Sequence, residues 1–364
     1  RSTLFPYTTL FRSPMDRRET FRTTYKAFTE RLFLREQRGN SSEGKEVKEA
    51  NPLVALQAAP GGGKSYFLDL LVKLRTEDID EFCTSSTCEQ EELSEEYFRQ
   101  MRDILKSSVP VCVTFNGKSP LTDAEKKRGD MLERLALRTL HSYFFTSKLP
   151  FRKFMKRVLD LSLDFGDVLQ CIRYHSQKLR RLPKPPSVLL CVDELIRAAD
   201  DFLPFKPYNP LTPEGTKALV GLLHEVCATT DQQGPDMLNL IVSTLDLAPV
   251  VGATTGSQRP VKWTPLPPLT QVSAEKLFVP LLASVTNERR RQLQLCISDC
   301  AGHPRTLEGL YGILKSATYR QEARPAKILD HLADQQVLQM STTRAAPFET
   351  VKVCYILRFP PTVN

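Results

Sequence analysis

Residues 57–71 read QAAPGGGKSYFLDLL, and this stretch decides the fold. The glycine triplet at 61–63 alone would predict only a turn, because flexible residues most often reverse the chain between two elements. The residues on either side of the triplet are more informative. The apolar run 53–56 before it is typical of a buried strand, and Lys64 and Ser65 follow it directly, ahead of an apolar-periodic helix. A strand, a glycine loop, a Lys-Ser pair and a helix together predict a cradle for an anionic group.

The pattern matches the nucleotide-binding P-loop, G-x-x-x-x-G-K-[ST], except that Ala58 occupies the place of the first glycine. Alanine suits the extended backbone expected at the strand end. Loop N–H groups and the positive end of the helix dipole would face the phosphates of ATP. Lys64 would reach the β- and γ-phosphates, and Ser65 would hold Mg²⁺. The sequence predicts these nucleotide-binding residues: Pro60, Gly61, Gly62, Gly63, Lys64, Ser65 and Tyr66.

A second motif, LLCVDE, occupies residues 189–194, about 130 residues after the loop. Four apolar residues indicate a buried strand whose carboxyl end would deliver two acids to the crevice beside the phosphates. Asp193 would orient Mg²⁺, and Glu194 would align or deprotonate the attacking water. The alternative is a strand followed by a helix cap, since both acids favour helix N-termini. The upstream loop favours the catalytic interpretation.

A third apolar strand ends in a polar pair within LIVSTLD, residues 240–246. In ATPases with an Asp-Glu second motif, a polar residue at this place contacts the γ-phosphate or its water. Thr244 is slightly preferred over Ser243 for that catalytic role. The alternative is a buried hydroxyl bonded to backbone, which is common.

The segments APGGGKS, CVDEL, LIVSTLD and AGHPRTLEGL follow one another in this order. Together they resemble the AAA+/STAND class of P-loop ATPases over about residues 50–320. More narrowly, APGGGKSYFLDLL with VCVTFNG, LALRTLHSYFF and GHPRTLE resembles the ATPase module of Crinkler and retrotransposon-hot-spot (RHS) effector proteins. The resemblance implies Mg-dependent ATP binding and hydrolysis between an α/β core and a small helical lid.

Arginines near the end of the chain acquire roles only through this resemblance. In that class a glycine-x-proline turn, here Gly302 to Pro304, opens a lid helix, and Arg305 matches a nucleotide-sensing arginine. The alternative places Arg305 on an exposed helix face. The run Arg289, Arg290 and Arg291 could include an arginine finger that reaches the nucleotide site of a neighbouring subunit. The pattern favours the alternative, a run of solvated charge.

Alternating strands and helices predict an α/β fold: a parallel sheet covered by helices on both faces, with a helical lid. Strands are expected at 53–56, 109–116, 187–194, 237–246 and 261–266, and helices at 19–36, 124–145, 151–182, 216–228 and 273–335. Residues 1–13 back-translate codon for codon into a common sequencing adapter, which we interpret as an artefact. The other expected divisions are an N-terminal segment at 14–49, which ends in a mobile linker at 37–49, an ATPase core at 50–270 and a lid at 271–335. The C-terminal extension at 336–364 is expected to be truncated.

Bulk composition limits the partners. Without Arg1 and Arg12, 48 basic and 42 acidic residues leave a net charge of +6, weak support for a polyanionic partner. The nine scattered cysteines are typical of buried thiols in an intracellular reducing compartment. Cys83 with Cys88, and Cys296 with Cys300, lack the further ligands that zinc requires. No apolar run approaches the roughly 18 residues of a membrane span, so we expect no membrane association.

Several functions stay open at this point. A nucleotide-gated switch would bind ATP with little turnover. The Asp-Glu pair disfavours a small-molecule kinase. A guanine nucleotide is disfavoured as the ligand because the sequence lacks an Asn-Lys-x-Asp element that would recognise the base. A nucleic-acid-associated ATPase finds support in a basic helical region, although such faces are usually only solvated. Its cations are Arg152, Lys153, Lys156, Arg157, Arg173, Lys178, Arg180 and Arg181. The sequence leaves open a homo-oligomer, a protein client and the cell compartment, and the effector families carry further domains, so we expect a module of a larger protein.

Overall fold

The structure is a computed structural model of the chain. It describes residues 17–37, 45–58, 62–74, 79–80, 93–115, 121–128, 130–146, 148–158, 161–195, 197–198, 213–232, 234–244, 250–251 and 259–342. Pro60, Gly61 and the adapter-like segment 1–13 therefore lie outside the described residues, as does most of the acidic stretch 77–96.

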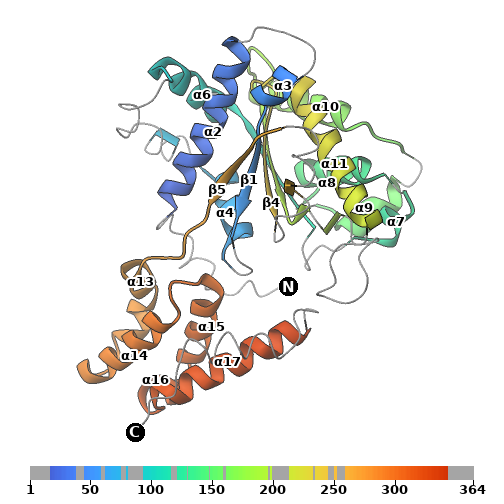
Figure 1. The fold of residues 1–364 in the computed structure, drawn as a ribbon. Coiled ribbons are helices and arrows are strands. Elements are labelled where there is room, and N and C mark those ends of the chain that lie inside the picture. The colour runs from blue at the N-terminus through green and yellow to red at the C-terminus, as the bar shows by residue number, and fades with distance from the viewer. Residues whose placement is uncertain are drawn as a thin grey trace.

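Five parallel strands form one sheet in the order β2-β3-β4-β1-β5 (Figure 1). The strands are β1 (Leu53–Gln57), β2 (Val109–Thr114), β3 (Val188–Asp193), β4 (Leu238–Thr244) and β5 (Val261–Pro265). This confirms the predicted parallel sheet and each of its five expected strands. Strand β4 lies between the loop strand β1 and the acid strand β3, so residues at the carboxyl ends of all three meet at one edge.

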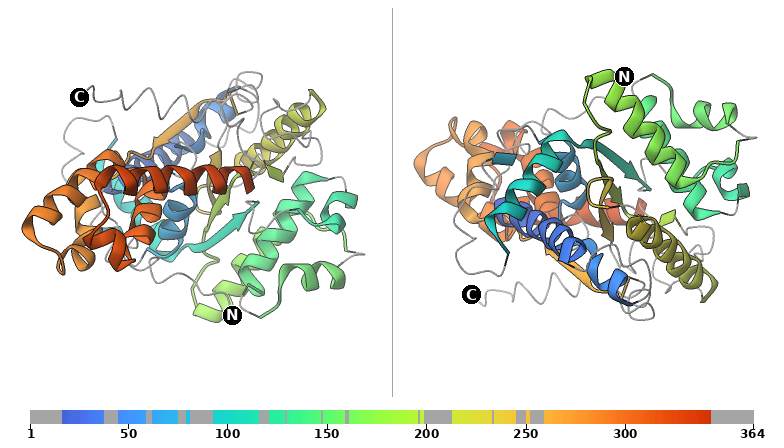
Figure 2. Two further views of the ribbon diagram at one scale, coloured as in Figure 1. Left: turned by 90° about the horizontal axis from the view of Figure 1, so that it is seen from below. Right: turned by 90° about the horizontal axis from the view of Figure 1, so that it is seen from above.

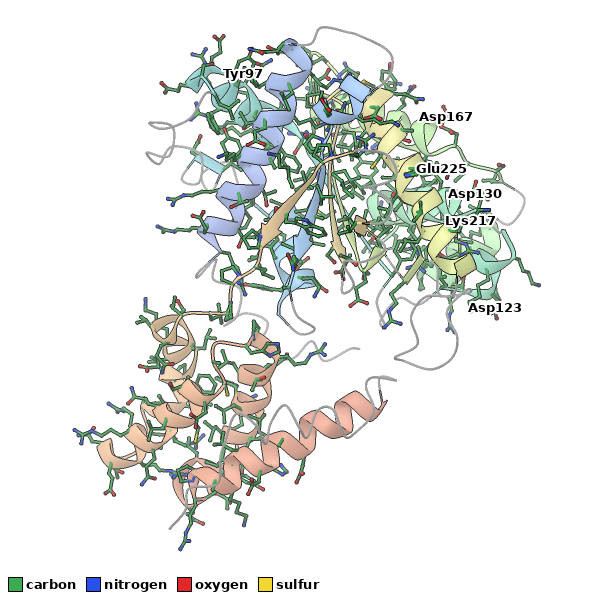
Figure 3. All side chains as sticks on the ribbon, in the orientation of Figure 1. Tyr97, Asp123, Asp130, Asp167, Lys217 and Glu225 are labelled. Atoms are coloured by element: carbon green, nitrogen blue, oxygen red, sulfur yellow. The ribbon has the colours of Figure 1, made fainter. Side chains whose placement is uncertain are left out.

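The strands are apolar on both faces because helices cover both (Figure 2). On β1, Val54 and Leu56 belong to one core cluster, while Leu53 and Ala55 belong to the other. Period-two alternation of side chains explains this division. Figure 3 shows side chains filling the space between sheet and helices.

One face of the sheet is covered by α2 (Arg18–Gln37), α4 (Lys64–Val72) and α6 (Glu95–Ser107). Phe21 and Phe28 of α2 lie in the same cluster as Phe67 of α4. The amphipathic helix predicted at 19–36 is confirmed, and it is a layer of the core rather than a separate lead-in. The expected linker 37–49 is partly wrong, since α3 (Lys45–Ala50) is helical.

The other face is covered by α8 (Met131–Phe144), α10 (Phe165–Arg180) and α11 (Pro213–Gln232). Two short helices, α7 (Asp123–Arg128) and α9 (Phe151–Arg157), pack beside α8. The single helix predicted at 124–145 is wrong. Asp130 begins a new helix by accepting bonds from the backbone N–H groups of Leu132 and Glu133.

The lid contains α13 (Gln271–Leu282), α14 (Asn287–Asp299), α15 (Pro304–Leu314), α16 (Ala317–Gln321) and α17 (Pro325–Thr342), with its own apolar cluster. It lies beyond the carboxyl ends of the strands (Figure 1). The expected lid boundary at 335 falls inside α17. No helix in the described residues is long and apolar enough to cross a membrane.

Candidate nucleotide site

The glycine loop leads from the end of β1 to the start of α4. Gly63 has a φ of 95°, in the left-handed region, and among the described residues no side chain caps the N-terminus of α4. The first N–H groups of a helix need partners, and an anion can supply them. The left-handed Gly63 and the start of α4 are compatible with the predicted anion cradle.

Three distant segments meet at Gly63. A Cβ built there would stand 3.4 Å from Nη2 of Arg17 and 3.7 Å from Cγ of Pro304. Arg17 is buried just before α2 and donates to the carbonyl oxygen of Pro267, between β5 and the lid. The loop, the N-terminal helix and the lid thus contact one another at this point.

Lys64 is the first residue of α4 and is buried. Its Nζ donates to the carbonyl oxygen of Ala58, 2.6 Å away, across the mouth of the loop. Burial lowers the pKa of its ammonium group, and the carboxylates of Glu194 and Asp193 oppose that shift. Ser65 is exposed in the first turn of α4, and Tyr66 beside it is half-buried.

Asp193 is buried at the end of β3, and hydroxyl groups from both neighbouring strands hold its carboxylate. Ser243 of β4 donates to Oδ1 at 2.8 Å, and Thr114 of β2 donates to Oδ2 at 3.1 Å. Two charge-assisted bonds from opposite sides fix the orientation of the carboxylate.

Glu194 follows directly, in a left-handed conformation with a φ of 53°. A non-glycine residue in this region is uncommon and is associated with functional sites. Its N–H donates to Oγ of Ser243 at 3.0 Å, which anchors the turn. Burial and the adjacent Asp193 raise the pKa of the Glu194 carboxyl, and nearby cations, first Arg197 and then Lys64, partly offset this.

Ser243 and Thr244 both lie buried at the end of β4. The Ser243 hydroxyl joins the two acids, because it donates to Asp193 and accepts from the backbone of Glu194. The preference for Thr244 as a γ-phosphate contact stays a prediction. Strand order explains why Ser243 reaches both acids, since β4 is the neighbour of β3.

In the lid, Gly302 and Pro304 shape the turn before α15. Gly302 has a φ of 68°, and a Cβ there would stand 1.9 Å from the carbonyl oxygen of Leu269, so the position requires glycine. Arg305 is exposed, yet its charge acts on both Lys64 and Glu194. Arg305 therefore lies on the side of the lid that faces the acid pair.

Arg289, in contrast, is buried and bonded within the lid. It donates to the carbonyl oxygens of Arg320, Tyr319 and Ala323. A run of solvated charge is therefore the wrong interpretation for Arg289, whose guanidinium joins α14 to the segment around α16. Arg291 is exposed.

Sequence reasoning missed Arg17 and Thr114, and it left open which hydroxyl serves the acids. It also missed Arg138, which donates to the carbonyl oxygen of Thr114 and pairs with buried Glu125 at 2.6 Å. No local motif marks these side chains, because each acts on a residue far away in the chain.

The site brings together carboxylate and hydroxyl oxygens, an ammonium group and the N-terminus of a helix. Ser65 and Asp193 would hold Mg²⁺, which prefers such oxygen ligands. The uncapped start of α4 and Lys64 suit the phosphates. Within the described residues, no group of three His, Cys, Asp or Glu side chains could hold a metal alone. Cys296 and Cys300 are buried thiols, and Cys83 and Cys88 lie outside the described residues.

The sheet, the loop between β1 and α4, and the acids on β3 define an α/β P-loop NTPase fold. No protein-family profile matches the chain, and no curated protein matches its sequence. A search of solved structures finds similarity to the Walker-type ATPase PABY2304 of Pyrococcus abyssi. That similarity has a TM-score of 0.41 and 11% identity, over 85% of this chain and 72% of the other.

Proposed function

We propose that this protein binds Mg·ATP between its core and lid and hydrolyses it. The observation that carries the proposal is the convergence of Lys64, Asp193 and Glu194 at one edge of the sheet, beside an uncapped helix N-terminus. The order of its motifs and the lid after the sheet support an AAA+/STAND-like ATPase. The resemblance to Crinkler and RHS modules belongs to the same proposal.

Each residue has a defined task in this proposal. Lys64 neutralises phosphate charge, while Ser65 and Asp193 hold the magnesium ion, which itself supplies further charge neutralisation. Glu194 aligns the attacking water and accepts its proton. Thr244 and Arg305 contact the γ-phosphate region from β4 and the lid.

A second function, a nucleotide-gated switch, draws support from one observation. Pro304 of the lid lies 3.7 Å from the position of a Cβ at Gly63, so the loop and lid adjoin. ATP in the loop would act on the lid through this contact, with or without turnover. Measured turnover separates the two functions.

Calorimetry on Lys64→Ala tests the nucleotide site. We expect the wild type to bind ATP with Mg²⁺ in the micromolar range, about −8 kcal/mol. Because the proposal assigns Lys64 to the β- and γ-phosphates, its loss should weaken binding by about 10- to 100-fold. Lys73→Ala is the matched control, since Lys73 lies exposed at the other end of α4. Equal affinity in Lys64→Ala and the wild type would refute the site.

A further inference from the structure

The helix α9 separates its apolar and basic residues completely. Phe154 and Met155 are 2% and 1% exposed and lie in a cluster with Leu137 of α8. Its four cations point outward, as does Lys148 just before it. We call these exposed cations the α9 basic surface: Lys148, Arg152, Lys153, Lys156 and Arg157.

No carboxylate forms an ion pair with these cations within the described part of the chain. None of the four on α9 forms an ion pair there, whereas Arg138, one layer below, pairs with Glu125. Arg152 with Lys156, and Lys153 with Arg157, stand one helical turn apart, where like charges repel. The fold therefore retains a concentration of positive charge that its own packing does not use.

We propose that the α9 basic surface binds the phosphate backbone of a nucleic acid. Evenly spaced phosphates would relieve the repulsion and release counterions. An anionic membrane fits less well, because the apolar side of α9 is already buried and leaves nothing to insert. An acidic protein remains as an outcome of the test.

The surface provides backbone contacts rather than base recognition. Phe151, the aromatic residue at the start of α9, is half-buried and has the Arg138 guanidinium 4.9 Å from its ring centroid. It is not free to stack on a base. Contacts from lysine and arginine to phosphates carry no sequence information, so binding should be independent of sequence.

A chain of side-chain contacts connects α9 with the acid pair. Arg138 stacks on Phe151 and donates to the carbonyl oxygen of Thr114 at the end of β2. The Thr114 hydroxyl in turn bonds Asp193 at 3.1 Å. Figure 1 shows α7 and α9 side by side at the margin of the core, and Figure 3 marks this margin with Asp123 of α7. The helix that carries the α9 basic surface is thus linked to Asp193 through Phe151, Arg138 and Thr114.

Fluorescence anisotropy with a labelled DNA duplex, without nucleotide, tests the proposal. Neutralising about four phosphates should weaken binding about 100-fold between about 50 and about 200 mM salt. We expect the double variant Lys153→Glu, Lys156→Glu to lose binding at the lower salt. The matched control is Lys178→Glu, Lys184→Glu, which reverses two exposed lysines near the amino end of β3. Two unrelated duplex sequences should bind equally.

Several outcomes would overturn the proposal: no duplex binding at low salt, an unchanged affinity in the reversed variant, or equal losses in the control. Capture by polyglutamate or phosphatidylserine vesicles but not by duplex DNA or RNA would assign the surface to another partner. If the reversed variant fails to fold, Lys153→Ala, Lys156→Ala replaces it, and binding like that of the wild type would again refute the proposal.

A second readout rests on the proposed ATPase function. Saturating duplex should change ATP turnover by at least about fivefold, the lower range of typical coupling. Lys64→Ala should still bind duplex. If the protein binds duplex but does not hydrolyse ATP, only the proposed ATPase function is refuted. If it hydrolyses ATP but does not bind duplex, only the proposed role of the α9 basic surface is refuted.

Discussion

The acid pair and the phosphate loop lie at the same edge of the sheet, but they are held very differently. Asp193 is fixed by hydroxyls from two strands, and the backbone of Glu194 is fixed by one of them. Around the loop, α4 has no side-chain cap, and Lys64 bonds a loop carbonyl. The two acids are thus held in place without a ligand. The hydrogen bond of Lys64 to the Ala58 carbonyl oxygen can instead be exchanged for a bond to a ligand.

This difference accords with the chemistry of each part. A base and a magnesium-holding carboxylate must be placed accurately before the reaction, since preorganised charge requires no rearrangement during it. A phosphate cradle gains its partners from the ligand itself. Substitutions in the acid pair should therefore mainly reduce turnover, and substitutions in the loop should mainly reduce affinity.

The largest expected effect follows from Glu194→Gln. The amide keeps the shape of the side chain but cannot accept a proton, so turnover should fall about 100-fold or more. ATP affinity measured by calorimetry should stay close to the wild type. Phosphate release at saturating ATP gives the rate. A variant that hydrolyses ATP at the wild-type rate would reduce Glu194 to a cap of the turn after β3.

A smaller effect is expected from Ser243→Ala. The change removes a donor to Asp193 and an acceptor for Glu194, and each unmade buried bond costs about 1–3 kcal/mol. We expect turnover to fall about tenfold and thermal stability to decrease. Gln321→Ala, at an exposed position of the lid, controls for handling.

The variant Thr244→Val tests whether the Thr244 hydroxyl has a role different from that of the Ser243 hydroxyl. If Thr244 contacts the γ-phosphate, its variant should lose turnover while the acids keep their positions and stability changes little. A loss confined to Thr244→Val, with Ser243→Ala active, would contradict the role that we give to Ser243.

Features that are local in the chain could be predicted from the sequence. Apolar runs identified the five strands. The Lys-Ser pair follows β1 after the glycine loop, and the Asp-Glu pair stands at the end of β3. The break between α7 and α8 also had a local signal, since Asp130 with Glu133 resembles a capping box. That signal was outweighed by the longer apolar period around it.

Contacts between distant residues could not be predicted. Arg17 and Pro267 are 250 positions apart, and Thr114 and Asp193 are 79 apart. The first contact depends on where α2 packs beside β5, and the second depends on which strands are neighbours. The apolar pattern of a buried strand is the same for every neighbour. The choice between Ser243 and Thr244 is of this kind, because only the placement of β4 beside β3 gives Ser243 its two bonds.

The smallest expected effect concerns pH. Burial and Asp193 raise the pKa of Glu194 above its ordinary value of 4.5. A base works when deprotonated, so turnover should be constant above that raised pKa and fall as the pH drops through it. Arg197 opposes the shift, since its Nε lies 3.7 Å from the Glu194 carboxylate.

Arg197→Ala should therefore raise the pKa of Glu194 further and move the acid limb of the turnover profile to higher pH. The pair is partly exposed, so its loss is worth about 0.2–1 kcal/mol, at most about fivefold in rate on the acid limb. Turnover well above the limb should not change. Rates measured across the acid range for the wild type, Arg197→Ala and Arg197→Lys provide the comparison, and Lys should restore the wild-type limb. If the acid limb of the Arg197→Ala profile lies at the same pH as that of the wild type, a group other than Glu194 determines it. The pH profile would then not support Glu194 as the base.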